Sequence, residues 1–76
     1  MNNIRRKELG KLSAQLEEIK DALENLKSEE EEYLENMPEG LQGSERGERA
    51  SEAIENMDSA MDSLDEAISC IESAQE

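Results

Sequence analysis

Carboxylates are the side chains of this sequence with the greatest capacity for chemistry. Twenty-one of the 76 residues are Asp or Glu, and histidine is absent. Asp58, Asp62, Asp65 and Glu66 recur at the spacing that places side chains on one side of a helix. Oxygen ligands of this kind suit Ca²⁺ or Mg²⁺, but the loop and glycine of an EF-hand are missing. We therefore expect incidental, weak cation binding here and no dedicated metal site.

Catalysis needs more than a large number of carboxylates. General acid–base and nucleophilic mechanisms use histidine, or carboxylates whose pKa is shifted by burial. No Gly-rich phosphate-binding loop follows a strand pattern. The single cysteine, Cys70, has acidic rather than basic neighbours, which does not favour a reactive thiolate. The sequence therefore predicts a protein that is not an enzyme and that carries no cofactor.

The densest group of acids is the run SEEEEYLE at residues 28–35. Adjacent glutamates repel one another, and negative charge is unfavourable near the C-terminal end of a helix. One interpretation is a solvated helix face, and the other is a surface kept for a basic partner. In the second interpretation the acidic surface comprises Glu29, Glu30, Glu31, Glu32, Glu35, Glu39, Asp58 and Asp62. Tyr33, Leu34 and Leu41 would serve as exposed apolar anchors beside it.

Charge is distributed unevenly along the chain. Residues 1–20 carry five basic and three acidic side chains, net +2, whereas residues 21–76 carry three basic and eighteen acidic ones, net −15. Such a surface repels nucleic acid and anionic membranes and favours basic protein partners. Folded into a hairpin, residues 21–66 would carry one net negative charge per about 2.5 Å of hairpin length. Duplex DNA carries one negative charge per about 1.7 Å of its axis. This segment could therefore occupy a basic, nucleic-acid-binding cleft.

The elements that must position these charges are two helices with a heptad pattern. Apolar residues follow steps of three and four, as in a coiled coil. In the first half they are Leu9, Leu12, Leu16, Ile19, Leu23, Leu26, Tyr33 and Met37, with Glu30 in phase. In the second half they are Ala50, Ile54, Met57, Met61, Leu64, Ile68 and Ile71. The pattern predicts helices at about 3–36 and 44–74, an N-cap at Ser44, and a turn at 37–43.

The short connection favours an antiparallel hairpin within one domain, residues 1–76. The apolar residues of the two helices can pair in layers whose residue numbers sum to 87. The midpoint of each such pair along the chain then falls between residues 43 and 44, at the predicted turn. The layers include Ile19 with Ile68, Leu26 with Met61 and Tyr33 with Ile54. The same register places Lys20 near Asp65 and Lys27 near Asp58, two pairs of opposite charge on one edge.

Alanine recurs every seven residues in the second helix, at Ala53, Ala60, Ala67 and Ala74. Small side chains beside the seam let another helix approach closely, and they widen the apolar side of this helix. A second copy of the hairpin would cover it, giving a homodimeric antiparallel four-helix bundle. The alternative is that alanine is present as the best helix former. Oligomerisation would also stabilise a chain of this size, whose own core contributes only about 3–5 kcal/mol.

The segment ENMPEGLQGSERGERASEAIENMDSAMDSLDEAIS resembles a group of small acidic helical proteins from phages, prophages and mobile elements of Gram-positive bacteria. The turn, residues 36–46, is the specific part of the resemblance, and a basic start and alanine-led acidic heptads accompany it. The resemblance implies a context, in which small phage proteins often bind and block host factors such as restriction or CRISPR-type defence. It implies no roles for individual residues.

Two functions follow as expectations. The first is an accessory protein that binds and inhibits a host defence or nucleic-acid-handling protein. The second is a structural or oligomerisation coiled-coil module that recognises itself or another helix. A small-molecule sponge built in a bundle core would require convergent polar groups, which the sequence does not supply. No apolar run reaches the roughly 20 residues that span a bilayer, and residues 1–12 do not form a secretion signal, so we expect a cytoplasmic location.

Overall fold

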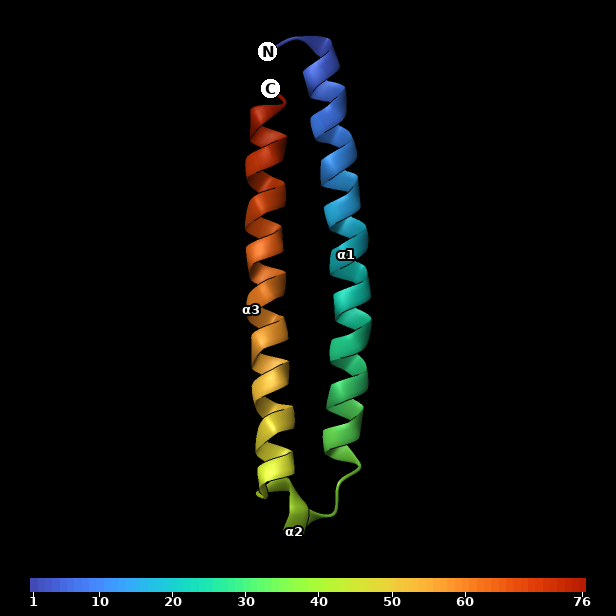
Figure 1. The fold of residues 1–76 in the computed structure, drawn as a ribbon, viewed down its shortest axis with the longest axis vertical. Helices are drawn as coiled ribbons and strands as arrows, with labels where there is room; N and C mark the ends of the chain where they lie inside the picture. Colours follow the sequence, from blue (N-terminus) through green and yellow to red (C-terminus); the bar gives the residue numbers. More distant parts are fainter.

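The chain forms a hairpin of two long helices (Figure 1). In the computed structural model, which describes residues 1–76, α1 spans Asn3–Glu35, α2 spans Glu39–Gln42 and α3 spans Glu45–Ala74. Helices α1 and α3 run antiparallel and bring both chain ends to the same end of a molecule measuring 59 × 14 × 12 Å. The expectation of an all-α structure, in which two long helices pack against each other, is confirmed.

Side chains that cap the helices fix where they begin. The Asn2 side chain accepts a hydrogen bond from the backbone N–H of Arg5 at 2.8 Å, which starts α1. Ser44 caps α3 as the sequence predicts, since its hydroxyl accepts from the backbone N–H of Gly47 at 3.4 Å. Glu45 and Glu48 follow in the first turn, where the positive end of the helix dipole favours them.

The connection differs from the expected turn, because part of it is helical. The backbone N–H groups of Leu41 and Gln42 donate to the Pro38 carbonyl oxygen at 2.8 and 3.2 Å, and these bonds close the single turn of α2. Proline suits the start of such a turn because it has no N–H to leave unpaired. Helix α1 ends one residue earlier than expected, and α3 begins one residue later, after its cap.

Two ion pairs between the long helices set their register. Lys20 Nζ lies 2.6 Å from Asp65 Oδ1, and Lys27 Nζ lies 2.5 Å from Asp58 Oδ1. Both contacts were predicted from the sequence. The register continues to the chain ends, where Gln75 Nε2 donates to the Arg6 carbonyl oxygen at 3.2 Å.

Helix α1 presents a different side to α3 from the one that its apolar pattern predicts. On α3 the predicted seam is present, with Ala50 and Ile68 only 4% and 5% exposed. On α1 one predicted row is instead 50, 53, 56 and 45% exposed: Leu12, Ile19, Leu26 and Tyr33. The row one residue further along is buried or half-buried in its place: Ser13, Lys20, Lys27 and Leu34. The predicted layers through Ile19, Leu26 and Tyr33 are therefore wrong, and α1 is rotated by roughly 50°.

The ion pairs explain this rotation. The side chains of Lys20 and Lys27 are only 26% and 22% exposed, because their aliphatic stems lie along the seam while their ammonium groups reach the aspartates. A two-helix hairpin covers one side of each helix, and the apolar side of α1 is wider than α3 can cover. Four large apolar side chains, Leu12, Ile19, Leu26 and Tyr33, therefore remain on the surface and are called the apolar row below.

Candidate functional site

The turn end of the hairpin carries the predicted acids and anchors, and Gln42 holds it together. Its side-chain Nε2 donates to the carbonyl oxygens of Leu34 and Met37 at 3.4 and 3.2 Å. These carbonyls lie at the end of α1, where helical partners run out. Ser44 adds a hydrogen bond from its hydroxyl to the Leu41 carbonyl oxygen. The turn segment thus has a structural role, which the sequence pattern alone did not reveal.

Gly47 permits a close backbone approach in the same turn. A Cβ atom at this position would lie 2.0 Å from the Gln42 carbonyl oxygen, much closer than any carbon side chain tolerates. Only glycine therefore lets the first turn of α3 pack against the end of α2. By contrast, a Cβ atom added at Gly40 or Gly43 would meet no atom within 4 Å.

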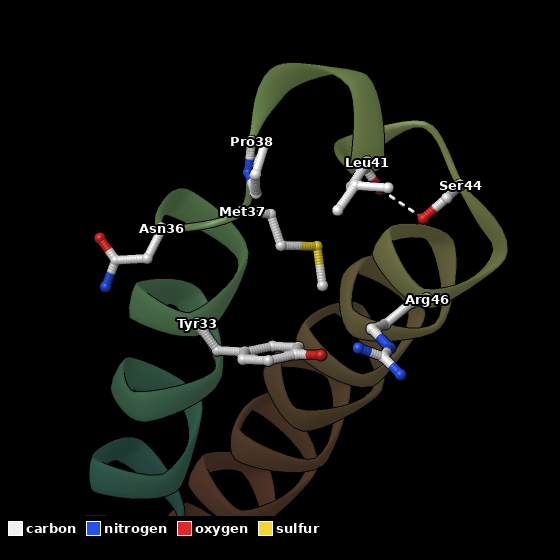
Figure 2. Close-up of a pocket in the computed structure, with 7 residues that line it drawn as sticks. All are labelled: Tyr33, Asn36, Met37, Pro38, Leu41, Ser44 and Arg46. Carbon is white, nitrogen blue, oxygen red and sulfur yellow. Dashed lines mark hydrogen bonds between the residues drawn. The ribbon is translucent and has the colours of Figure 1, made fainter.

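Two of the three predicted anchors lie together at a shallow hollow beside the turn. Figure 2 shows Tyr33 and Leu41 at this hollow, with Met37 between them and Arg46 at its edge. Its volume is about 420 Å³, and Asn36, Pro38 and Ser44 complete its wall. Tyr33 and Leu41 are both exposed. A protruding apolar side chain of another protein could be accommodated here.

Leu34, the third predicted anchor, has a different position. It is half-buried and belongs to the α1 row that faces α3, where it borders a groove with Ser51 and Ile54. The expectation that Leu34 is exposed is therefore wrong, because the rotation of α1 turns this residue inward and Tyr33 outward. Its burial contributes to packing between the helices.

The acids of the run surround α1 instead of forming one face. Consecutive helical residues point about 100° apart, so four adjacent glutamates cover all directions. Glu31 and Glu35 border the groove beside Leu34, whereas Glu29 and Glu30 border another groove with Leu26 and Tyr33. Glu30 is half-buried, and the other predicted acids are exposed: Glu29, Glu31, Glu32, Glu35, Glu39, Asp58 and Asp62.

Most of this negative charge is not neutralised within the hairpin. Of the eight predicted partner-binding acids, only Asp58 forms an ion pair, with Lys27. The hydrogen bond to Asp58 raises the pKa of Lys27, with additional attraction from Glu31 and Glu24, although burial opposes the shift. The pKa of Lys20 is raised in the same way, by its hydrogen bond to Asp65.

No cluster of three or more potential ligand side chains is arranged to hold a metal ion. Two of the four acids considered above, Asp58 and Asp65, are bound to lysines. Cys70 is a free, exposed thiol on α3. None of the helices combines the length and apolar character needed to cross a membrane.

The alanines lie on the edge of the hairpin opposite the ion pairs. Ala53 and Ala67 are half-buried, and Ala60 and Ala74 are exposed. The apolar row of α1 lies on this same edge, because it stands on the far side of its seam from Lys20 and Lys27. Sequence reasoning did not find this arrangement, although the lysines one residue after Ile19 and Leu26 were a signal for it.

Comparison with protein-family models, with functionally characterised proteins and with solved structures gives no match to this chain.

Proposed function

We propose that the protein acts by binding, with the acidic, turn-proximal part of the hairpin docked on a basic surface of a partner protein. The observation that carries this proposal is the charge distribution. Residues 21–66 contain sixteen acids and three bases, net −13, whereas the rest of the chain contains five of each. Within that segment only Glu45, Asp58 and Asp65 form ion pairs, so the excess charge is available to a partner.

The spacing of this charge suggests what the partner surface normally binds. In the hairpin, residues 21–66 occupy about 33 Å of length, so the net charge is about one per 2.5 Å. Duplex DNA carries one charge per about 1.7 Å. A cleft built for nucleic acid would therefore attract this end of the hairpin, and its occupation would inhibit the partner. Together with the resemblance to phage and mobile-element proteins, this favours a host defence or nucleic-acid-handling protein as the target.

Apolar contacts would add to the charge attraction. Charges at the rim of an interface mainly raise association rates, whereas buried aromatic and aliphatic anchors supply much of the affinity. Tyr33 and Leu41 meet at the hollow beside the turn, and both are available to a partner. We propose that these two residues anchor the complex when the hairpin docks as a single copy.

The test is an affinity pulldown from the natural host with three forms of the full chain. These are the native protein, a variant with Glu29, Glu30, Glu31 and Glu32 changed to Gln, and a control with Glu8, Glu17, Glu18 and Glu72 changed to Gln. We expect the native protein and the control to retain a nucleic-acid-binding partner at low salt, and to block its nucleic-acid binding. Retention that is unchanged by high salt or by the Glu29–Glu32 substitutions would contradict this mechanism.

A second candidate function, self-association, is favoured by the apolar row. We propose that the hairpin is also an oligomerisation module that forms a homodimeric four-helix bundle. In this case activity would be lost when Ala60 or Ala67 is changed to Glu, and it would survive neutralisation of Glu29–Glu32. The two functions are thus separated by which set of substitutions abolishes activity.

A further inference from the structure

The surface opposite the ion pairs is a continuous apolar face, formed by the apolar row of α1 and the alanines of α3. The two ion pairs join residues whose numbers sum to 85. Four further pairs sum to 86 and so lie within one residue of level in that register: Leu12 with Ala74, Ile19 with Ala67, Leu26 with Ala60, and Tyr33 with Ala53. Each large side chain of α1 therefore stands beside a small one of α3 along this edge.

The middle of the apolar face has few charged neighbours, in a chain of which 38% is charged. The row next to the alanines on α3 holds Asn56, Ser63 and Cys70, with Arg49 at its turn end. The row next to the apolar row on α1 holds Gln15 and Ala22. The nearest acids are Glu8, beyond Leu12, and Glu29, which borders the groove at Leu26 and Tyr33 together with Glu30. Depletion of charge around exposed aliphatic and aromatic side chains is the composition of an interface core.

Building on the proposed self-association, we infer that this apolar face is covered by the same face of a second copy, with the two turns at opposite ends. Both rows are centred on one level, between Ile19 and Leu26 on α1 and between Ala60 and Ala67 on α3. A two-fold axis through this level places Ile19 opposite Leu26 of the second copy. It also brings the alanine rows of the two α3 helices together, where small side chains permit the close approach of helices.

Charge decides the relative direction of the copies. Cut at the central level, the turn half (residues 23–63) carries thirteen acids and three bases, net −10. The terminal half carries eight acids and five bases, net −3. If both turns lay at the same end of the dimer, two halves with a net charge of −10 would face each other. With the turns at opposite ends, each half with a net charge of −10 faces a half with a net charge of −3. The antiparallel arrangement also places Lys11 within two residues of the level of Glu32 of the second copy.

The size of the face suits a dimer. A surface of 59 × 14 Å has an area of roughly 800 Å². Specific protein–protein interfaces bury about 800 Å² on each partner, so one copy supplies the area that a stable complex needs. The face extends along the length of the hairpin and includes Tyr33. The dimer therefore covers this anchor, while Leu41 and the outer acidic faces of both copies remain exposed.

Sedimentation of the full chain tests the dimer. We expect two 8.5 kDa chains per particle, and a dissociation constant raised about a hundredfold by Ala60→Glu, since that substitution buries a charge in both copies. The control is Ala14→Glu on the opposite, exposed side of α1, which we expect to leave the dimer intact. A monomeric native chain, or equal effects of the two variants, would overturn both the self-association and the assigned face.

Spin-label distances test the direction. A Cys70→Ser, Gly43→Cys variant carries one label at the turn, where Gly43 has open space around it. With the turns at opposite ends, we expect a distance between labels on the order of 60 Å, from the helix rise of 1.5 Å per residue. A distance below about 20 Å in a dimer would overturn the direction while leaving self-association standing. Neither result bears on the acidic docking function, which the pulldown tests separately.

Discussion

At the scale of the residue, the hairpin depends on a few side chains at its turn. Gln42 contributes both its side chain, which binds carbonyls at the end of α1, and its own carbonyl, against which Gly47 packs. These contacts join three helices through two residues. A glycine in the first turn of α3, which is unfavourable by helix propensity, is explained by this packing.

Gly47→Ala should therefore destabilise the protein. The new methyl group would overlap the backbone of Gln42, so the turn must open or α3 must start later, at a cost of about 2–3 kcal/mol. Thermal unfolding followed by circular dichroism measures the change. Gly43→Ala is the matched control, with open space and an ordinary φ of −86°, and it should change stability by less than about 0.5 kcal/mol. Equal losses in both variants would show that packing at Gly47 is not the cause.

At the scale of the element, the orientation of α1 is governed by where two lysines lie. Both stems cover the seam and both ammonium groups bind aspartates of α3. Because the hydrogen bonds to Asp65 and Asp58 raise the pKa values of Lys20 and Lys27 above 10.5, the folded state holds these protons more tightly than the unfolded chain. The resulting stabilisation is complete below pH 10.5 and is lost as the pH rises through the higher folded values.

Stability should accordingly decline above about pH 10.5, and the decline should depend on these two lysines. A Lys20→Met, Lys27→Met variant keeps the apolar stems but removes the titrating groups, so its melting temperature should fall less steeply between about pH 9 and pH 12. Lys7→Met with Lys11→Met serves as the control and should retain the native slope. A native slope in the Lys20 and Lys27 variant would exclude the ion pairs as its source.

The sequence predicted the elements better than their orientation. Helix positions, the Ser44 cap and both lysine–aspartate pairs follow from periodicity and register, which depend on local spacing. The rotation of α1 could not be predicted in the same way. Ile19 and Lys20 belong to neighbouring rows that both repeat every seven residues, so periodicity does not distinguish between them. Which row enters the seam depends on whether α3 offers an aspartate to the lysine. Similarly, α2 is too short for periodicity, and the contact of Gln42 with Gly47 depends on the path of the turn.

For the candidate site, seven of the eight predicted acids are exposed, but not every predicted anchor is. The exposure of Tyr33 and Leu41 agrees with the prediction, and their meeting at one hollow required the structure. Leu34 was misplaced because its orientation depends on the same rotation of α1. The apolar row was assigned to the seam for the same reason, so a single unpredicted angle accounts for both errors.

At the scale of the whole molecule, the net charge of −13 opposes a compact state. The repulsion is concentrated near the turn, where Glu29–Glu32 form no ion pair. At 0.1 M ionic strength, salt largely screens the repulsion between exposed charges that lie more than about 10 Å apart. The folded hairpin is therefore expected to be more stable at higher ionic strength, even though its two interhelical ion pairs are weakened.

We expect the melting temperature to rise by on the order of 5 °C between about 20 mM and 500 mM NaCl, at a fixed protein concentration. The rise should be smaller when Glu29, Glu30, Glu31 and Glu32 are changed to Gln, because four repelling charges are then absent. Circular dichroism melts of both proteins make the comparison. A melting temperature that falls with salt would mean that ion pairs outweigh repulsion in this fold.

The two chain ends lie at the same end of the hairpin, where Gln75 is hydrogen-bonded to the backbone of Arg6. Force applied between these ends would act across the helix pair and not along it. The hairpin should open like a zipper, with the contact between Lys20 and Asp65 breaking before that between Lys27 and Asp58. A protein anchored through either end would meanwhile hold its most negative region farthest from the anchor.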